Sequence, residues 1–180
     1  QQQADYKIKV QIEPRARKLS GSETVIYTNN SPVSLDYLWL QLDQNLRDPQ
    51  SVSRQMDQAL ELAEFSYREE VANNSNPFQG GVKLGKVTDK NGGDLSYYVG
   101  ETNLRINLEQ PLEPGEKVEF NLEWSYKIND AAIEGRSGCE YFPRDDNFIF
   151  EIAQFYPRMC AYTQDKGWQN RPFYGGAEFA

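Results

Sequence analysis

Histidine, the side chain most often used to hold zinc or to move protons near neutral pH, is absent from all 180 residues. The chain therefore has no HExxH zinc helix, no Ser-His-Asp triad and no Cys-His pair. We expect no catalytic residue and no metal ligand within it, and we do not expect this chain alone to be an enzyme.

Two polar side chains that could bind a ligand occur among aromatic residues late in the chain. Glu151 and Gln154 fall in a predicted strand over residues 148–156, which leads into a loop. Loops at strand ends often carry binding residues. An ordinary strand explains the same pattern, with Glu151 facing solvent and the aromatic rings in the core. The residues alone leave both interpretations open.

The remaining reactive groups have simpler explanations. Cys139 and Cys160 are the only cysteines, and their separation fits either one disulfide or two buried thiols. The acidic segment 89–94 is similar to a calcium loop, but its Asn-Gly pair favours a plain hairpin turn. We interpret Asp145 and Asp146 as a solvated turn rather than half of a carboxylate site.

Composition limits the class of protein and its partners. Apolar residues make up 38% and aromatic residues 13% of the chain, enough for one folded core, so we expect a single β-rich domain over residues 1–180. The formal net charge of −8 argues against a nucleic-acid partner. No apolar run is long enough to cross a bilayer, so we expect no transmembrane segment.

Strand signals dominate the chain. Apolar and polar residues alternate over residues 6–12, 19–28 and 35–42, which predicts a three-strand meander. Further strands are predicted at 80–87, 95–99, 103–108, 117–128 and 148–156. Between them, apolar residues three or four apart after Asp48 and Pro49 predict one helix. The expected fold is mainly β: an antiparallel, saddle-like double sheet or sandwich with one inserted α-helix.

Several motifs, in this order, resemble the first domain of bacterial aminopeptidase N-like gluzincins, which are zinc metallopeptidases. They are the opening strand YKIKV at residues 6–10, the segment SGSETVIYTNNSP at 20–32, the strand LDYLWLQL at 35–42, QFYPRM at 154–159 and GAEF at 176–179. Each motif is only moderately specific, whereas their order and spacing are more so. The resemblance extends over nearly the whole chain.

The resemblance implies a β domain that packs on its own thermolysin-like catalytic domain and helps to form the pocket for the substrate N-terminus. Zinc is then expected in that catalytic domain and no cofactor in residues 1–180. The strand near residues 150–156 would supply the residue that binds the substrate amine, with Gln154 and Glu151 as candidates. The sequence starts at Gln1 without an initiator Met, which fits either a mature end left by removal of a signal peptide or an arbitrary boundary, and we expect a periplasmic or secreted protein. The resemblance implies a bacterial source and a chain that stops before the domain's last strands.

Two other functions fit the same sequence. An aromatic-rich β sandwich could act as a stand-alone protein- or glycan-binding module, and a homologue without catalysis could serve as an interaction scaffold. These alternatives predict no aminopeptidase activity.

Overall fold

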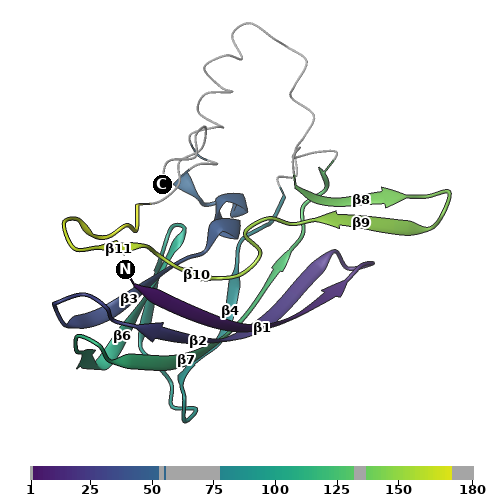
Figure 1. Cartoon of the computed structure of the whole chain (residues 1–180). Helices are drawn as coiled ribbons and strands as arrows, with labels where there is room; N and C mark the ends of the chain where they lie inside the picture. The colour runs from purple at the N-terminus through teal and green to yellow at the C-terminus, as the bar shows by residue number, and fades with distance from the viewer. Residues whose placement is uncertain (1, 53–54, 56–77, 132–136, 172–180) are drawn as a thin grey trace, which may run out of the picture.

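The computed structural model describes residues 2–52, 55, 78–131 and 137–171, and two four-stranded antiparallel sheets form its body (Figure 1). Sheet A has the order β1-β2-β7-β4 and sheet B the order β10-β3-β6-β5. Two hairpins, β8–β9 and β11–β12, complete the strands. The predicted class, a mainly β double sheet, is confirmed.

The bounds of the strands and of the one short helix are as follows. Sheet A contains β1 (Gln3–Glu13), β2 (Lys18–Thr28), β7 (Lys117–Lys127) and β4 (Lys83–Asp89). Sheet B contains β10 (Arg158–Met159), β3 (Leu35–Gln41), β6 (Asn103–Leu112) and β5 (Tyr97–Gly100). The hairpins are β8 (Gly138–Phe142) with β9 (Asn147–Glu151), and β11 (Tyr162–Thr163) with β12 (Gly167–Trp168). A 3-10 helix, η1, covers Asp43–Arg47.

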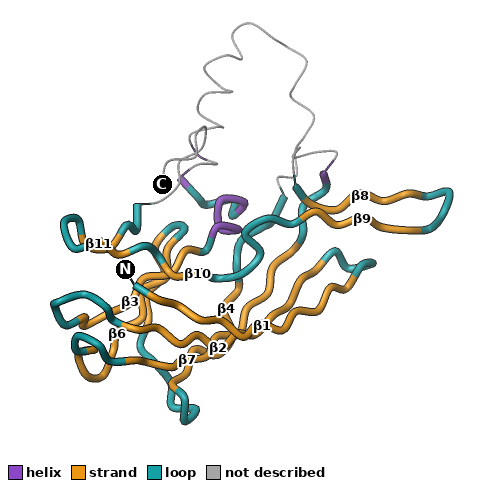
Figure 2. Tube along the Cα trace, viewed as in Figure 1, coloured by secondary structure: helices purple, strands orange, loops and turns teal. Residues whose placement is uncertain are grey.

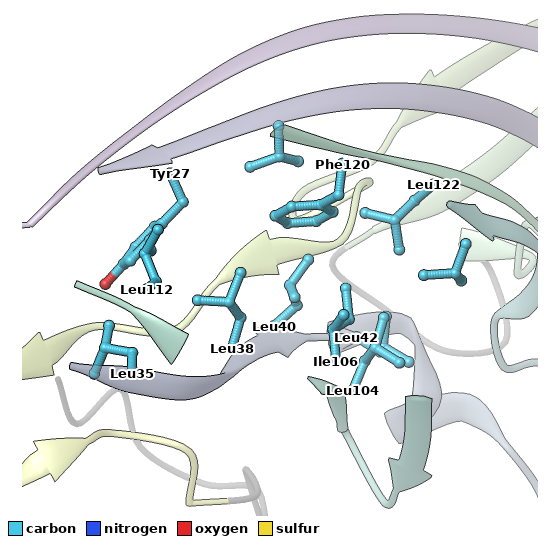
Figure 3. Close-up of a cluster of buried hydrophobic side chains, with 12 residues drawn as sticks. Tyr27, Leu35, Leu38, Leu40, Leu42, Leu104, Ile106, Leu112, Phe120 and Leu122 are labelled. Atoms are coloured by element: carbon cyan, nitrogen blue, oxygen red, sulfur yellow. The ribbon is translucent and has the colours of Figure 1, made fainter. Parts of the chain in front are cut away.

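The core lies between the two sheets, where side chains from both inner faces interdigitate (Figure 3). Phe120 and Leu122 of β7 point from sheet A toward Leu38 and Leu40 of β3, and all four are fully buried. Period-two alternation produces this arrangement, because every second residue of a strand faces the same side. A second cluster, built around Leu19, Trp124 and Tyr126, fills the space beneath the β8–β9 hairpin.

The predicted meander is wrong in one respect: β3 does not pair with β2 but belongs to sheet B. The turn at Asn29 carries the chain from one sheet to the other. The Asn29 side chain is completely buried and donates to the backbone oxygens of Val33 and Leu112, both at 2.8 Å, while its oxygen accepts from the Ser31 amide at 3.0 Å. These bonds fix a crossover between sheets where a hairpin would keep both strands in one sheet.

The Asn-Gly turn is confirmed, although the strands beside it separate after it. Asp89 accepts from the backbone amides of Asn91 and Gly93, at 2.7 and 2.8 Å, and these bonds hold the pKa of its carboxyl below the usual value. β4, which ends at Asp89 before the turn, lies in sheet A, whereas β5, which follows the turn, joins sheet B. The carboxylate therefore organises the turn.

Other differences concern element ends. β8 was not predicted, and the predicted strand 148–156 ends at Glu151. The helix predicted after Asp48 lies almost entirely outside the described residues. Across the described part of the chain, no helix has the length and apolar character needed to span a membrane.

Candidate functional site

Glu151 and Gln154 lie on a loop between β9 and β10, not in the middle of a strand. β9 ends at Glu151 and β10 begins at Arg158, so residues 152–157 form the connection, which we call the binding loop. Gln154 has a φ of 48°, which ends the extended backbone. Both side chains are exposed, and neither makes a hydrogen bond or ion pair with any described residue. Their polar atoms are therefore open to a ligand.

Gln44 of η1, the 3-10 helix that follows β3 of sheet B, holds the binding loop from one side. The Gln44 side chain is 6% exposed, and its amide nitrogen donates to the backbone oxygens of Ala153 at 3.0 Å and Gln154 at 3.3 Å. Its oxygen accepts from Arg47 at 3.1 Å. Figure 2 shows η1, in purple, beside this loop. The backbone on which the Gln154 side chain stands is thus fixed from one side.

Sheet A holds the next residue of the loop. The indole nitrogen of Trp124 and the hydroxyl of Tyr126 both donate to the backbone oxygen of Phe155 at 3.3 Å. Both aromatic residues are 3% exposed, and burial raises the pKa of the Tyr126 hydroxyl well above its usual value. Because Trp124 and Tyr126 belong to β7, the loop is attached to both sheets.

The far end of the loop is equally well anchored. Arg158 forms a bidentate pair with Asp43, with Nε–Oδ2 at 2.9 Å and Nη2–Oδ1 at 3.2 Å. The Met159 amide donates to the Tyr6 hydroxyl at 2.9 Å, and burial raises the pKa of Tyr6 to about 12. Tyr6 is on the first strand, so the loop depends on residues far apart in the sequence.

A carboxylate and an amide oxygen held in this way can accept hydrogen bonds from a cation, and an ammonium group has three donors to offer. The described residues do not fit a zinc ion by themselves. Within the described ranges, no three His, Cys, Asp or Glu residues come close enough to hold a metal ion, and the whole sequence has no histidine. The arrangement can bind and orient a ligand, and we derive no metal-dependent step from it.

The other sequence candidates lie outside residues 152–157. Cys139 and Cys160 are both free and buried, so the structure contains two buried thiols and no disulfide between them. Burial raises the pKa of the Cys160 thiol to about 12 and also raises that of Cys139. Asp146 accepts from Arg15 at 2.5 Å and from the Tyr141 hydroxyl at 2.8 Å, which makes it part of an exposed hairpin contact.

Among the comparisons with known proteins, the comparison with solved structures gives matches. No protein-family model and no curated protein matches the sequence.

The similarity is to M1 zinc metallopeptidases. A structure of such an enzyme from Deinococcus radiodurans and one of its point mutant each have a TM-score of 0.43 and 15% identity, and each match covers 75% of this chain but 22% of theirs. A two-domain M1 zinc metallopeptidase mutant bound to L-tryptophan has a TM-score of 0.43 and 16% identity, with 78% of this chain and 23% of that chain covered. This chain therefore spans less than a quarter of each of those proteins.

Sequence reasoning missed the residues that position the loop. Gln44 follows directly on a predicted strand and gave no signal, because its partners are backbone atoms more than 100 positions away. The aromatic residues on the outer face of sheet B, in contrast, could have been found from the sequence. Tyr37 and Trp39 alternate with Leu38 and Leu40, which places two aromatic rings on the outer face of sheet B.

Proposed function

We propose that this chain is the substrate-capping domain of an exported, zinc-dependent aminopeptidase. It packs on a catalytic domain carried elsewhere in the protein and helps to form the pocket for the substrate's amino terminus. The observation that carries the proposal is the exposure of Gln154 and Glu151, without protein partners, on a loop that hydrogen bonds attach to both sheets. The resemblance of the QFYPRM and neighbouring motifs to such a domain adds support.

The chemistry of the loop suits a free amino terminus. The Gln154 side-chain oxygen accepts a hydrogen bond from an ammonium, and the Glu151 carboxylate also offsets part of its charge. Because Gln44 fixes the backbone at residues 153 and 154, little conformational freedom of the loop is lost on binding. Zinc binding and the hydrolytic step are assigned to the catalytic domain, since the residues that the structure describes do not fit a zinc ion.

One exposed apolar residue near the loop, Ile149, favours a domain contact. The β8–β9 hairpin extends away from the two sheets (Figure 1), and Ile149 is 51% exposed on it. Ile149 pairs with Glu140, and Glu151 pairs with Gly138, so Ile149 and Glu151 face the same side of the hairpin. We assign this side to the contact with the protein's own catalytic domain, because an apolar side chain gains free energy when such a contact removes it from water.

The binding role is tested by Gln154→Ala and Glu151→Ala in the complete protein. We expect each change to lower kcat/KM for peptides with a free amino terminus by about tenfold, since each removes a hydrogen bond to a charged group. Steady-state rates on peptide amides give the values. Unfolding curves should change little, because both side chains are exposed and make no contact with described residues.

Glu119→Ala and Gln11→Ala are matched controls, since each removes an exposed side chain of the same type from sheet A, away from the β8–β9 hairpin. They should leave kcat/KM unchanged. Equal kinetics in all four variants would show that the loop does not hold the amine. A wild-type protein without peptidase activity would instead favour a binding module or an inactive scaffold.

A further inference from the structure

A second candidate site lies on the outer face of sheet B, away from the binding loop. A half-open cleft of about 460 Å³ separates the start of β3 from the β11–β12 hairpin. Tyr37, Trp39, Arg105, Lys166 and Trp168 line it, and we call it the aromatic cleft. Two tryptophans, two tyrosines, including Tyr162, and two cationic side chains in one cleft are a combination suited to binding a ligand.

Arg105 has no polar partner among the residues that the structure describes. Its guanidinium carbon lies 4.0 Å from the centre of the Tyr37 ring, a cation–π contact that fixes the orientation of the side chain. No described residue accepts a hydrogen bond from Arg105 or forms an ion pair with it, and its buried Nε is unsatisfied. The terminal Nη groups of Arg105 make no hydrogen bond with a described residue, and their fork of N–H donors suits a carboxylate. The missing acceptor indicates an anionic ligand.

The net charge of the cleft is opposite in sign to the net charge of the whole chain. Arg105 and Lys166 contribute two positive charges and Asp36 one negative charge, whereas the whole chain carries −8. An anion is therefore repelled by the protein in general but attracted to this cleft, and screening by salt should weaken that attraction.

The Trp168 ring, which we call the aromatic wall of the cleft, is held rigid by two other aromatic rings. The Trp168 ring lies 5.8 Å from the ring of Tyr27 and 5.2 Å from that of Tyr162, measured between centroids. Tyr27 is itself part of the buried core. A rigid aromatic ring offers a flat apolar surface to a ligand at little entropic cost.

We propose that the aromatic cleft binds an acidic sugar, a hexuronate unit of a glycan. Its carboxylate binds the Arg105 guanidinium and the Lys166 ammonium, and its ring lies against the aromatic wall. The hydroxyl groups find hydrogen-bond partners in Asp36, Asn170 and Ser34, which also line the cleft. These polar groups favour a sugar over an apolar carboxylate such as the C-terminus of a hydrophobic peptide, which would leave them without partners.

Tryptophan fluorescence provides the test, because Trp39 and Trp168 line the cleft while Trp124 is buried in the other cluster. Titrating the full chain with trigalacturonate should give a saturable change. Neutral galactotriose should bind at least about tenfold more weakly, since it lacks the charge-assisted bonds. Arg105→Gln should weaken trigalacturonate binding by about tenfold or more, and Lys166→Gln by a few-fold.

Lys83→Gln, which changes an exposed lysine on sheet A, should leave the affinity unchanged. Lys166 is exposed in a hairpin turn, so its variant tests the cleft even if Arg105→Gln fails to fold. Absence of binding by trigalacturonate, or equal binding of the neutral trisaccharide, would overturn the proposal. Tighter binding of N-acetylphenylalanine would overturn the sugar assignment in favour of a peptide carboxylate.

Discussion

Raising the pH from about 5 to about 9 should lower the free energy of unfolding by about 4 kcal/mol through one residue, Glu23. Its side chain is 2% exposed, and neither carboxyl oxygen has a hydrogen-bond partner among the described residues. Burial raises its pKa from 4.5 to about 8. The folded state therefore keeps a proton that the unfolded state releases, so stability is highest below the unfolded pKa and falls as the pH rises through the folded one.

Urea unfolding at several pH values measures the effect, and Glu23→Gln should remove most of the pH dependence between those limits. Tyr6 interacts electrostatically with Glu23, and its pKa of about 12 leaves it neutral throughout. Glu119→Gln, a change at an exposed position of β7, should leave the dependence as it is. If the Glu23→Gln protein loses stability with pH as steeply as the wild type, Glu23 is ionised in the fold and this account of it is wrong.

Gly21→Val should destabilise the domain by about 3 kcal/mol, because Gly21 makes room for the Trp124 ring. A Cβ atom at this position would lie 2.4 Å from Cζ2 and 2.7 Å from Cε2 of Trp124. The ring cannot move freely, since it is 3% exposed and its nitrogen donates to the Phe155 oxygen. Displacing it also disturbs the binding loop, so kcat/KM of the complete protein should fall as well.

A double-mutant cycle separates this clash from a general effect of β2. Trp124→Leu removes the ring, so the Gly21→Val/Trp124→Leu protein should be more stable than the sum of the two single changes allows. Ser22→Val, on the exposed face of the same strand, should alter stability by less than about 0.5 kcal/mol. Strict additivity of the two substitutions would show that Gly21 and Trp124 do not compete for space.

The alternation of apolar and polar residues predicts which face of a strand is buried, but it does not predict which sheet the strand belongs to. It places residues 19–28 and 117–128 in strands, and the same parity puts Glu23 beside Val25 and Tyr27 on the inner face, so its burial could have been inferred. It does not reveal that β3 leaves β2 for the other sheet, because the crossover depends on bonds from Asn29 to Leu112, 83 positions away. Odd or even position in a strand decides which face a side chain is on, whereas long-range hydrogen bonds decide which strand it pairs with.

The binding loop shows the same division. The identity of Glu151 and Gln154 as candidate residues came from the sequence, whereas their position came from contacts that sequence reasoning does not reach. The predicted strand ends early because residues 153–155 bond through their carbonyls to Gln44, Trp124 and Tyr126 instead of to a neighbouring strand. Arg105 stayed unnoticed because one arginine in a strand is ordinary until its lack of a partner is seen.

The most direct test of the central claim is an assay of the complete gene product on matched peptides with free and acetylated amino termini, with and without a metal chelator. The account predicts release of amino-terminal residues from the free peptides alone, loss of that activity with chelator and its return with zinc. A product that cleaves neither peptide, or that cleaves both equally well, would contradict the assignment of this chain to an aminopeptidase.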